Sequence, residues 1–163
     1  MSVAASIQIT KSVLALKHRA DHDEQSHGNR GKVSDALKIT GGASSMQSLV
    51  NNVAVEGSAH ARDEISSAIL SGAKQKYAVW EGSKIIAAAA FGVNEDAVNA
   101  VVELHHIGSL RSGFGSSLMK KVKEFAARKR LPIRANIHED AKKFYEKHGF
   151  KQVHGTLYEY KGT

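Results

Sequence analysis

Three strand-like segments that follow one another through short turns constrain the fold of this chain most. The segments span residues 76–80, 84–91 and 97–107, and the residues between them, 81–83 and 94–96, are of turn-forming types. Turns of this length join antiparallel neighbours, because a parallel connection needs a crossover of a dozen or more residues. The centre of the chain is therefore predicted to be an antiparallel meander.

Helical periodicity brackets the meander on both sides. Apolar residues recur at helical spacing over 46–53, again over 65–69 with Gly72 as a stop, and most clearly over 118–126. The last of these places apolar side chains on one stripe and lysines on the other, which is typical of a helix packed on a sheet.

The C-terminal part of the chain adds strands around a short helix. Residues 133–137 form a predicted strand, which a loop and a helix separate from the meander, so we expect it to run parallel to the strand before the loop. Residues 140–148 are predicted as a helix, and 150–153 and 157–160 as the closing strands. The fold class is thus α/β of the α+β type, with a mixed, mostly antiparallel sheet flanked by helices.

The N-terminal part differs in character from the rest. Residues 17–34 are rich in charges and histidines and poor in large apolar residues, which indicates a solvated linker. We therefore expect an arm over 1–35 and a domain over 36–163, in which 36–40 is the candidate first strand. The linker histidines are interpreted as solvated side chains and not as metal ligands: His18, His22 and His27.

Composition limits the classes of function. The chain of 163 residues has no cysteine, which excludes disulfides, zinc–thiolate sites and cysteine nucleophiles. A net charge of +7 favours anionic partners, although solubility alone also explains it. Nucleic-acid binding is not expected, because aromatic residues make up 6% and none are interleaved with basic stretches. No apolar run reaches the roughly 18 residues of a membrane span, so we expect no membrane contact and a cytoplasmic location.

No metal site is expected either. His138-Glu139 begins like the zinc motif H-E-x-x-H, but the position of the second histidine is Lys142.

The loop over 110–117 is the strongest candidate for a ligand site. It connects a strand to the N-terminus of the best helix, where unpaired N–H groups and partial positive charge bind phosphate. Gly113 and Gly115 allow close approach of an anion, and Arg111 adds positive charge. The loop has neither the Gly-Lys-Ser/Thr of a P-loop nor the third glycine of a dinucleotide fingerprint. A plain turn with glycines for geometry stays the alternative.

Two motifs resemble the GNAT N-acetyltransferase superfamily. RSGFGSSL, residues 111–118, is similar to its R/Q-x-x-G-x-G/A pyrophosphate loop, and DAKKFYEKHGF, residues 140–150, resembles its A-x-x-F-Y-x-x-x-G-F signature. Leu110 occupies the R/Q position and His138 a position that is often asparagine. The resemblance covers about 44–160 and implies a GNAT fold, acetyl-CoA as co-substrate and transfer of the acetyl group to an amine.

The same resemblance implies the site residues. Cofactor contacts fall on His106, Ile107, Arg111, Ser112, Gly113, Phe114, Gly115, Ser116, His138 and Tyr145. The backbone near His106 and Ile107 would supply hydrogen-bond donors, and Tyr145 would give a proton to the leaving thiolate.

Glu103 is the candidate base, acting through water, and His105 is the second choice on the same strand face. Strand alternation places His106 on the opposite face. Tyr145 as a packed aromatic and Glu103 as a solvent-facing residue are the structural alternatives.

A second, shorter resemblance concerns the arm. Residues 21–31, DHDEQSHGNRG, resemble H-D-Q-x-x-H-G-x-x-G segments of some tailed-phage virion proteins. It implies a phage protein with a virion location, whose arm over 1–35 docks on a protein partner. The alternative function is thus a non-catalytic GNAT-fold module in an assembly. The acceptor of the catalytic alternative is not identified by any motif.

Overall fold

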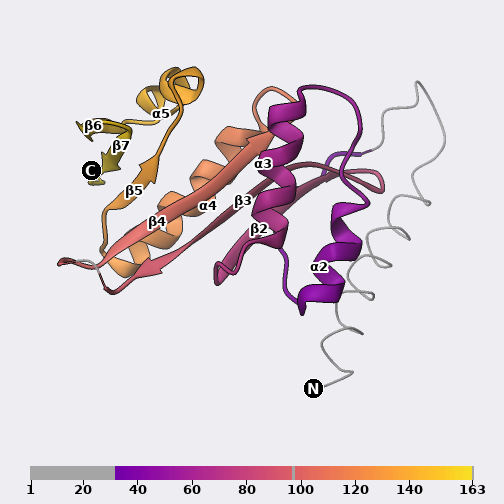
Figure 1. The fold of residues 1–163 in the computed structure, drawn as a ribbon, viewed down its shortest axis with the longest axis horizontal. Coiled ribbons are helices and arrows are strands. Elements are labelled where there is room, and N and C mark those ends of the chain that lie inside the picture. Colours follow the sequence, from indigo (N-terminus) through magenta and orange to yellow (C-terminus); the bar gives the residue numbers. More distant parts are fainter. Residues whose placement is uncertain (1–31, 97, 163) are drawn as a thin grey trace.

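The computed structural model describes residues 32–96 and 98–162. Within them a seven-stranded sheet is flanked by four α-helices and a 3-10 turn (Figure 1). In chain order the elements are β1 (Leu37–Lys38), α2 (Ala43–Val50), α3 (Ala59–Leu70), β2 (Gln75–Glu81), β3 (Lys84–Asn94), β4 (Val101–Ser109), α4 (Phe114–Lys129), β5 (Ile133–Asn136), η1 (Glu139–Ala141), α5 (Lys142–Lys147), β6 (Lys151–His154) and β7 (Leu157–Tyr160).

The sheet has the strand order β1-β2-β3-β4-β5-β7-β6. All neighbours are antiparallel except β4 and β5, which confirms the mixed sheet and the parallel pair expected across α4. Only Val102↔Ile133 and Glu103↔Arg134 pair β4 with β5. Beyond these pairs the two strands diverge, as Figure 1 shows, and this divergence makes room for a site in the middle of the sheet.

The alanine run of β3 explains how both helical layers pack on this sheet. Ala88 and Ala90 face the core cluster of α2 and α3, whereas Ala87 and Ala89 face Leu118 of α4. All four alanines are fully buried. Side chains this small bring the helices close to the backbone of the central strand at native packing density. The alanine run of β3 is therefore a packing feature.

Helix α3 is fixed at both of its ends. Ser58 caps its N-terminus by accepting the backbone N–H of Ala61 at 3.4 Å. At the other end Lys76 Nζ of β2 donates to the carbonyl oxygens of Ile69 and Ser71, each at 2.9 Å. These bonds satisfy carbonyls that the helix leaves unpaired and hold α3 across the sheet.

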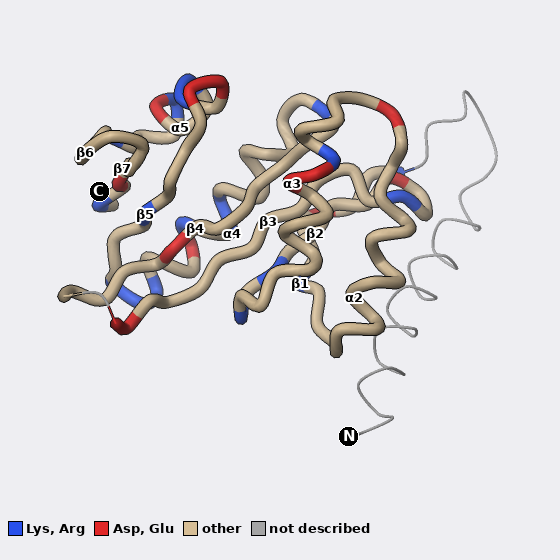
Figure 2. The backbone as a smooth tube through the Cα atoms, in the orientation of Figure 1, with Lys and Arg blue, Asp and Glu red and all other residues tan. Residues whose placement is uncertain are grey.

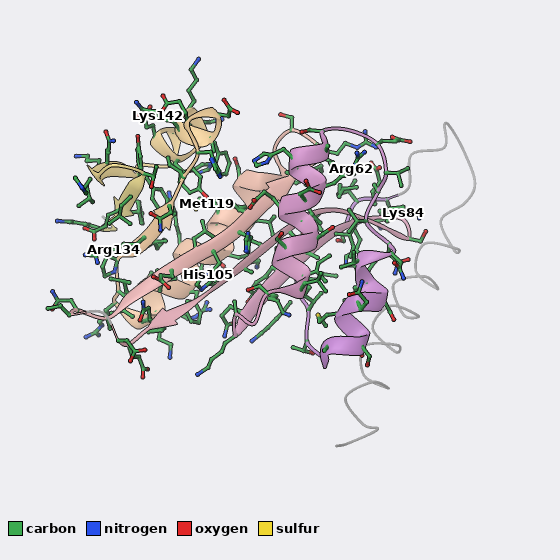
Figure 3. The ribbon with its side chains drawn as sticks, in the orientation of Figure 1. Arg62, Lys84, His105, Met119, Arg134 and Lys142 are labelled. Atoms are coloured by element: carbon green, nitrogen blue, oxygen red, sulfur yellow. The ribbon has the colours of Figure 1, made fainter. Side chains whose placement is uncertain are left out.

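A bulge in β4 changes the faces predicted for its histidines. His106 lies opposite Ala90 and Leu104 opposite Phe91, so His105 (labelled in Figure 3) is an extra residue without a partner on β3. The extra residue resets the alternation, and His106 contacts Glu64 of α3. The prediction that His106 faces away from His105 was therefore wrong, because strict alternation does not survive a bulge.

Several predicted elements have other bounds in the structure. The third strand begins at Val101 instead of residue 97, after a turn in which Asn94 Oδ1 accepts the N–H of Asp96 at 3.0 Å. The predicted helix over 140–148 is split into η1 and α5.

The last residues of the expected arm are hydrogen-bonded to strand β2. Ser34 donates its N–H to the carbonyl of Trp80 at 2.8 Å, and its Oγ accepts the N–H of Trp80 at 2.9 Å. The candidate strand over 36–40 is confirmed as β1. Residues 1–31, with the linker histidines and the phage-like segment, lie outside the described residues, so the arm and its partner stay predictions.

Charged residues of both signs are interspersed along the described backbone (Figure 2). No helix in the described ranges is both long enough and apolar enough to cross a membrane.

Candidate active site

A cavity of about 410 Å³ opens where β4 and β5 diverge. Its walls come from α3, the end of β4, the start of α4, the segment after β5, and α5. It brings together five of the residues expected at the cofactor site: His106, Ile107, Gly115, His138 and Tyr145. Segments that are far apart in the sequence thus converge on one volume, as a cofactor site requires.

The other expected cofactor residues lie in the loop before α4 and in its first turn, and they do not line this cavity: Arg111, Ser112, Gly113, Phe114 and Ser116. The guanidinium of Arg111 is held elsewhere, with Nη2 at 2.9 Å from Glu81 and 3.7 Å from Glu56. Arg111 therefore ties the loop to the end of β2 and to the segment before α3.

The two glycines of the loop have different roles. Gly113 is the N-cap of α4 with φ 92°, a left-handed conformation that favours glycine. Gly115 lacks a side chain for steric reasons, since a Cβ there would lie 3.2 Å from Cε2 of Phe144. The first N–H groups of α4 have no partner inside the helix, so the start of α4 presents donors and partial positive charge at this wall.

Tyr145 is buried in the wall, with 6% of its surface exposed. Its ring packs edge-to-face on Phe144 and Phe150, at centroid distances of 5.5 and 5.2 Å. No described residue makes a hydrogen bond to the Tyr145 hydroxyl. Among the described residues no fully buried side-chain oxygen lacks a hydrogen-bond partner, so the Tyr145 oxygen is not fully buried. Because Tyr145 lines the cavity, this oxygen opens into it. Burial, and then the charge of Glu64, raise the pKa of Tyr145 above its usual range. Tyr145 is therefore both packed and available as a proton donor.

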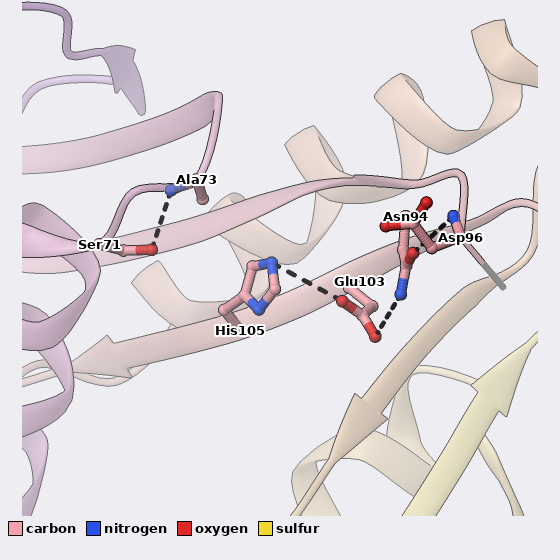
Figure 4. Close-up of polar contacts among 6 residues, drawn as sticks. All are labelled: Ser71, Ala73, Asn94, Asp96, Glu103 and His105. Carbon is pink, nitrogen blue, oxygen red and sulfur yellow. Dashed lines mark hydrogen bonds and ion pairs between the residues drawn. The ribbon is translucent and has the colours of Figure 1, made fainter.

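Glu103 lies beside the main cavity. It lines a second cavity of about 280 Å³, where its Oε1 accepts from Asn94 Nδ2 at 3.1 Å. Its Oε2 is 4.0 Å from His105 Nε2, and Figure 4 shows the two side chains on the same side of β4. This confirms the shared face of Glu103 and His105. His105 and Asn136 line both cavities, so the second cavity adjoins the first.

Sequence reasoning missed two ionisable residues of the main cavity, His60 and Glu64, which both come from α3. Glu64 Oε2 lies 3.2 Å from His106 Nδ1, and the ring of His60 stands edge-on to His138 at 6.0 Å. The signal was their i, i+4 spacing, which places two polar side chains on one helix face. Despite these histidines, no three histidine, cysteine, aspartate or glutamate side chains among residues 32–96 and 98–162 are arranged to hold a metal ion.

Comparison with protein-family models decides the family. Residues 45–163 match the acetyltransferase (GNAT) domain. The chain belongs to the GNAT acetyltransferase family. The motif at 140–150, together with the loop at 111–118, therefore belongs to a GNAT domain whose match includes strands β2 to β7 of the sheet described above.

Solved structures share the fold of this GNAT domain. The match to Tetrahymena GCN5 has a TM-score of 0.56 at 14% identity and covers 80% of this chain and 99% of that chain. The Bacillus subtilis N-acetyltransferase YlbP in complex with coenzyme A gives 0.50 at 18%, over 79% and 95%. The aminoglycoside N-acetyltransferase AAC(6')-Iy in complex with CoA gives 0.54 at 13%, over 80% and 95%. At these identities the likeness establishes the fold. A search of the curated proteins gave no match.

Two of the residues that depart from the GNAT motifs, Leu110 and His138, have identifiable contacts in the structure. Leu110 donates its N–H to the carbonyl of Ile86 at 2.8 Å, and its side chain covers Gly57, where a Cβ would lie 3.2 Å from Cδ2. Position 110 is therefore a packing position in this GNAT domain. His138 lines the main cavity and contacts the ring of His60, so the side chain at this position still lies at the site.

His148 links α4 to α5 in this GNAT domain and should make the stability of the domain depend on pH. Its Nε2 lies 3.0 Å from Ser116 Oγ, and burial, with Lys123 and Lys147, lowers its pKa below 6.5. The unfolded chain then takes up the proton first, so the free energy of unfolding should fall as pH drops through about 6.5 and level off below the folded pKa.

Replacing His148 with glutamine should reduce the slope of the unfolding free energy against pH, by up to the contribution of one proton. Denaturant unfolding at a series of pH values measures this slope. His154→Gln, on the exposed strand β6, is the matched control and should keep the wild-type dependence. An unchanged slope in the His148 variant would contradict the assignment.

Proposed function

We propose that this chain is an acetyl-CoA-dependent N-acetyltransferase, which moves the acetyl group of the thioester to the amine of an acceptor. The observation that carries the proposal is the buried Tyr145, whose hydroxyl opens into the cavity between the diverging strands β4 and β5. Family membership supports acetyl transfer in general, and relatives of the same fold were crystallised with coenzyme A.

The described residues fit acetyl-CoA as the ligand of this cavity. The N-terminus of α4 offers backbone donors and partial positive charge for the pyrophosphate, and Ser112 to Ser116 are the residues that we propose to hold it. Gly115 leaves open the space that a side chain would take against Phe144. His106 and Ile107 lie in the part of β4 beyond its last pair with β5, so its backbone on that side is free to bond the acyl arm and the oxyanion.

Proton transfer falls to side chains of the two cavities. The raised pKa of Tyr145 keeps its hydroxyl protonated across neutral pH, as a donor to a leaving thiolate must be. The sequence predicted Glu103 as the base, acting through water, and its carboxylate lies in the adjoining cavity. A polyamine, a lysine side chain, a protein N-terminus and an aminoglycoside all offer the amine that the reaction needs.

Calorimetry with acetyl-CoA tests the cofactor site. The wild type is expected to bind with micromolar affinity, and Gly115→Ala to bind at least about tenfold more weakly, which corresponds to about 1.4 kcal/mol. Alanine suits a helix better than glycine, so the variant keeps α4 and changes only the space beside Phe144.

Gly72→Ala is the matched control, because a Cβ at that position meets no atom within 4 Å. It should bind as the wild type does. Folded wild-type protein that does not bind acetyl-CoA would overturn the proposed function, and a Gly115 variant with wild-type affinity would overturn this placement of the cofactor.

A further inference from the structure

We propose that His106 is the base that removes the proton from the acceptor amine, and that Glu64 of α3 is the positioning residue that orients it. The proposal rests on the proposed function and adds to it a pair of residues that come from different layers of the fold. The base expected from the sequence was Glu103, and the contacts around the cavity favour His106 instead.

The geometry places the pair at the reacting end of the site. Glu64 Oε2 is 3.2 Å from His106 Nδ1, and both side chains line the main cavity together with Tyr145. Their exposed fractions are 34% for His106 and 29% for Glu64, so they are reachable from the cavity and largely shielded from bulk water. Glu103 does not line this cavity, and its carboxylate is engaged by Asn94.

Two features of the fold create this contact. The bulge at His105 turns His106 toward α3 instead of α4. Gly108, two residues later on β4, lets α3 approach, since a Cβ there would lie 2.8 Å from Cβ of Glu64. The fold therefore combines a register change and a missing side chain at the place where the pair forms.

The carboxylate selects which ring nitrogen acts. Glu64 accepts a hydrogen bond from Nδ1–H, so the lone pair of the neutral ring is on Nε2. Nε2 is then the atom left to take a proton from a molecule in the cavity. A base held by a third group in this way is a recurrent arrangement in catalytic sites, and imidazole titrates closest to neutral pH.

The step balances as follows. The acceptor enters as an ammonium ion, one N–H bond breaks, and the proton joins Nε2 of His106. The freed lone pair attacks the thioester carbonyl carbon, a C–N bond forms, and the carbonyl π electrons move to oxygen. Collapse of the adduct breaks the C–S bond. The sulfur takes the proton of Tyr145, whose phenolate takes one of the two protons still on nitrogen, and the other stays in the amide. The products are the amide, the free thiol and one proton, which His106 releases to water.

Several ionisable groups line the cavity together with His106. Helix α3 contributes Glu64 and His60, β4 contributes His105, and the far wall contributes His138 and Tyr145. Glu64 is the one carboxylate among the described lining residues. Its removal therefore takes away the negative charge that stabilises the imidazolium.

The experiment compares His106→Gln, Glu64→Gln and Glu103→Gln by thiol release from acetyl-CoA, over a range of pH and with a panel of amines. His106→Gln should lower kcat/KM by about 100-fold and remove the acidic limb of the pH profile. Glu64→Gln should lower kcat by roughly tenfold and shift that limb, with the affinity for acetyl-CoA unchanged by calorimetry. His154→Gln on β6 is the control and should match the wild type.

Nitrogen NMR of the imidazole rings gives a readout that needs no acceptor. His106 should be in the Nδ1–H form in the wild type and in a mixture of both neutral forms in Glu64→Gln. The Nε2–H form in the wild type would overturn the proposal, as would a His106 variant that keeps its rate and acidic limb while Glu103→Gln loses them. Absence of acetyl-CoA binding by the wild type would instead overturn the proposed function.

Discussion

Replacing Gly108 with alanine is expected to lower the free energy of unfolding by about 3 kcal/mol, the upper part of the range for overpacked sites. A Cβ at this position would lie 2.9 Å from the carbonyl oxygen of Ala61 and 3.1 Å from the backbone nitrogen of Ile65. These are backbone atoms of α3, so no rotamer change relieves the contact. The whole helix would have to move away from β4.

The movement should also reach the active site. Helix α3 carries Glu64, whose Cβ would lie 2.8 Å from the new methyl group, so the contact between Glu64 and His106 should lengthen. We therefore expect a weakened site in a protein that still folds.

Thermal and denaturant unfolding measure the loss directly. For a chain of this size about 3 kcal/mol corresponds to a fall in Tm of roughly 6 to 12 °C. Gly72→Ala is the matched control, since its added Cβ meets open space, and it should stay within about 0.5 kcal/mol of the wild type. An alanine at position 108 with wild-type stability would mean that α3 does not pack on β4 this closely.

Tyr145→Phe is expected to lower turnover by about 1000-fold, within the range for the loss of a positioned proton donor. The ring fills the same volume between Phe144 and Phe150, so the packing that holds α5 should survive. The change removes only the hydroxyl that opens into the cavity. The loss should therefore appear in kcat, while calorimetry with acetyl-CoA gives the wild-type affinity.

The pH dependence of the wild type separates this role from that of a base. The pKa of Tyr145 is raised by burial and by the charge of Glu64, so the hydroxyl stays protonated above the ordinary pKa of 10.0. Turnover should therefore show no alkaline limb from this residue between neutral pH and about pH 10. A Tyr145→Phe variant with near-wild-type kcat would show that another group protonates the thiolate.

The sequence by itself determined most of the architecture. Short turns over 81–83 and 94–96 required an antiparallel meander, and the helix over 118–126 required a parallel return, because both follow from local geometry. The loop before α4 and the aromatic signature around Tyr145 could likewise be read from residue types at fixed spacing. The structure confirmed these elements, and the family match assigned them to a GNAT domain.

Tertiary structure alone decided which side chains meet. The bulge at His105 depends on pairing with β3, which no periodicity in β4 announces, so the face of His106 was mispredicted. The guanidinium of Arg111 pairs with Glu81 and Glu56, which lie far from it in the chain. Glu64 reaches His106 across 42 residues because Gly108 leaves room for α3. Local pattern fixes the elements, whereas contacts between layers depend on where the packed backbones approach each other.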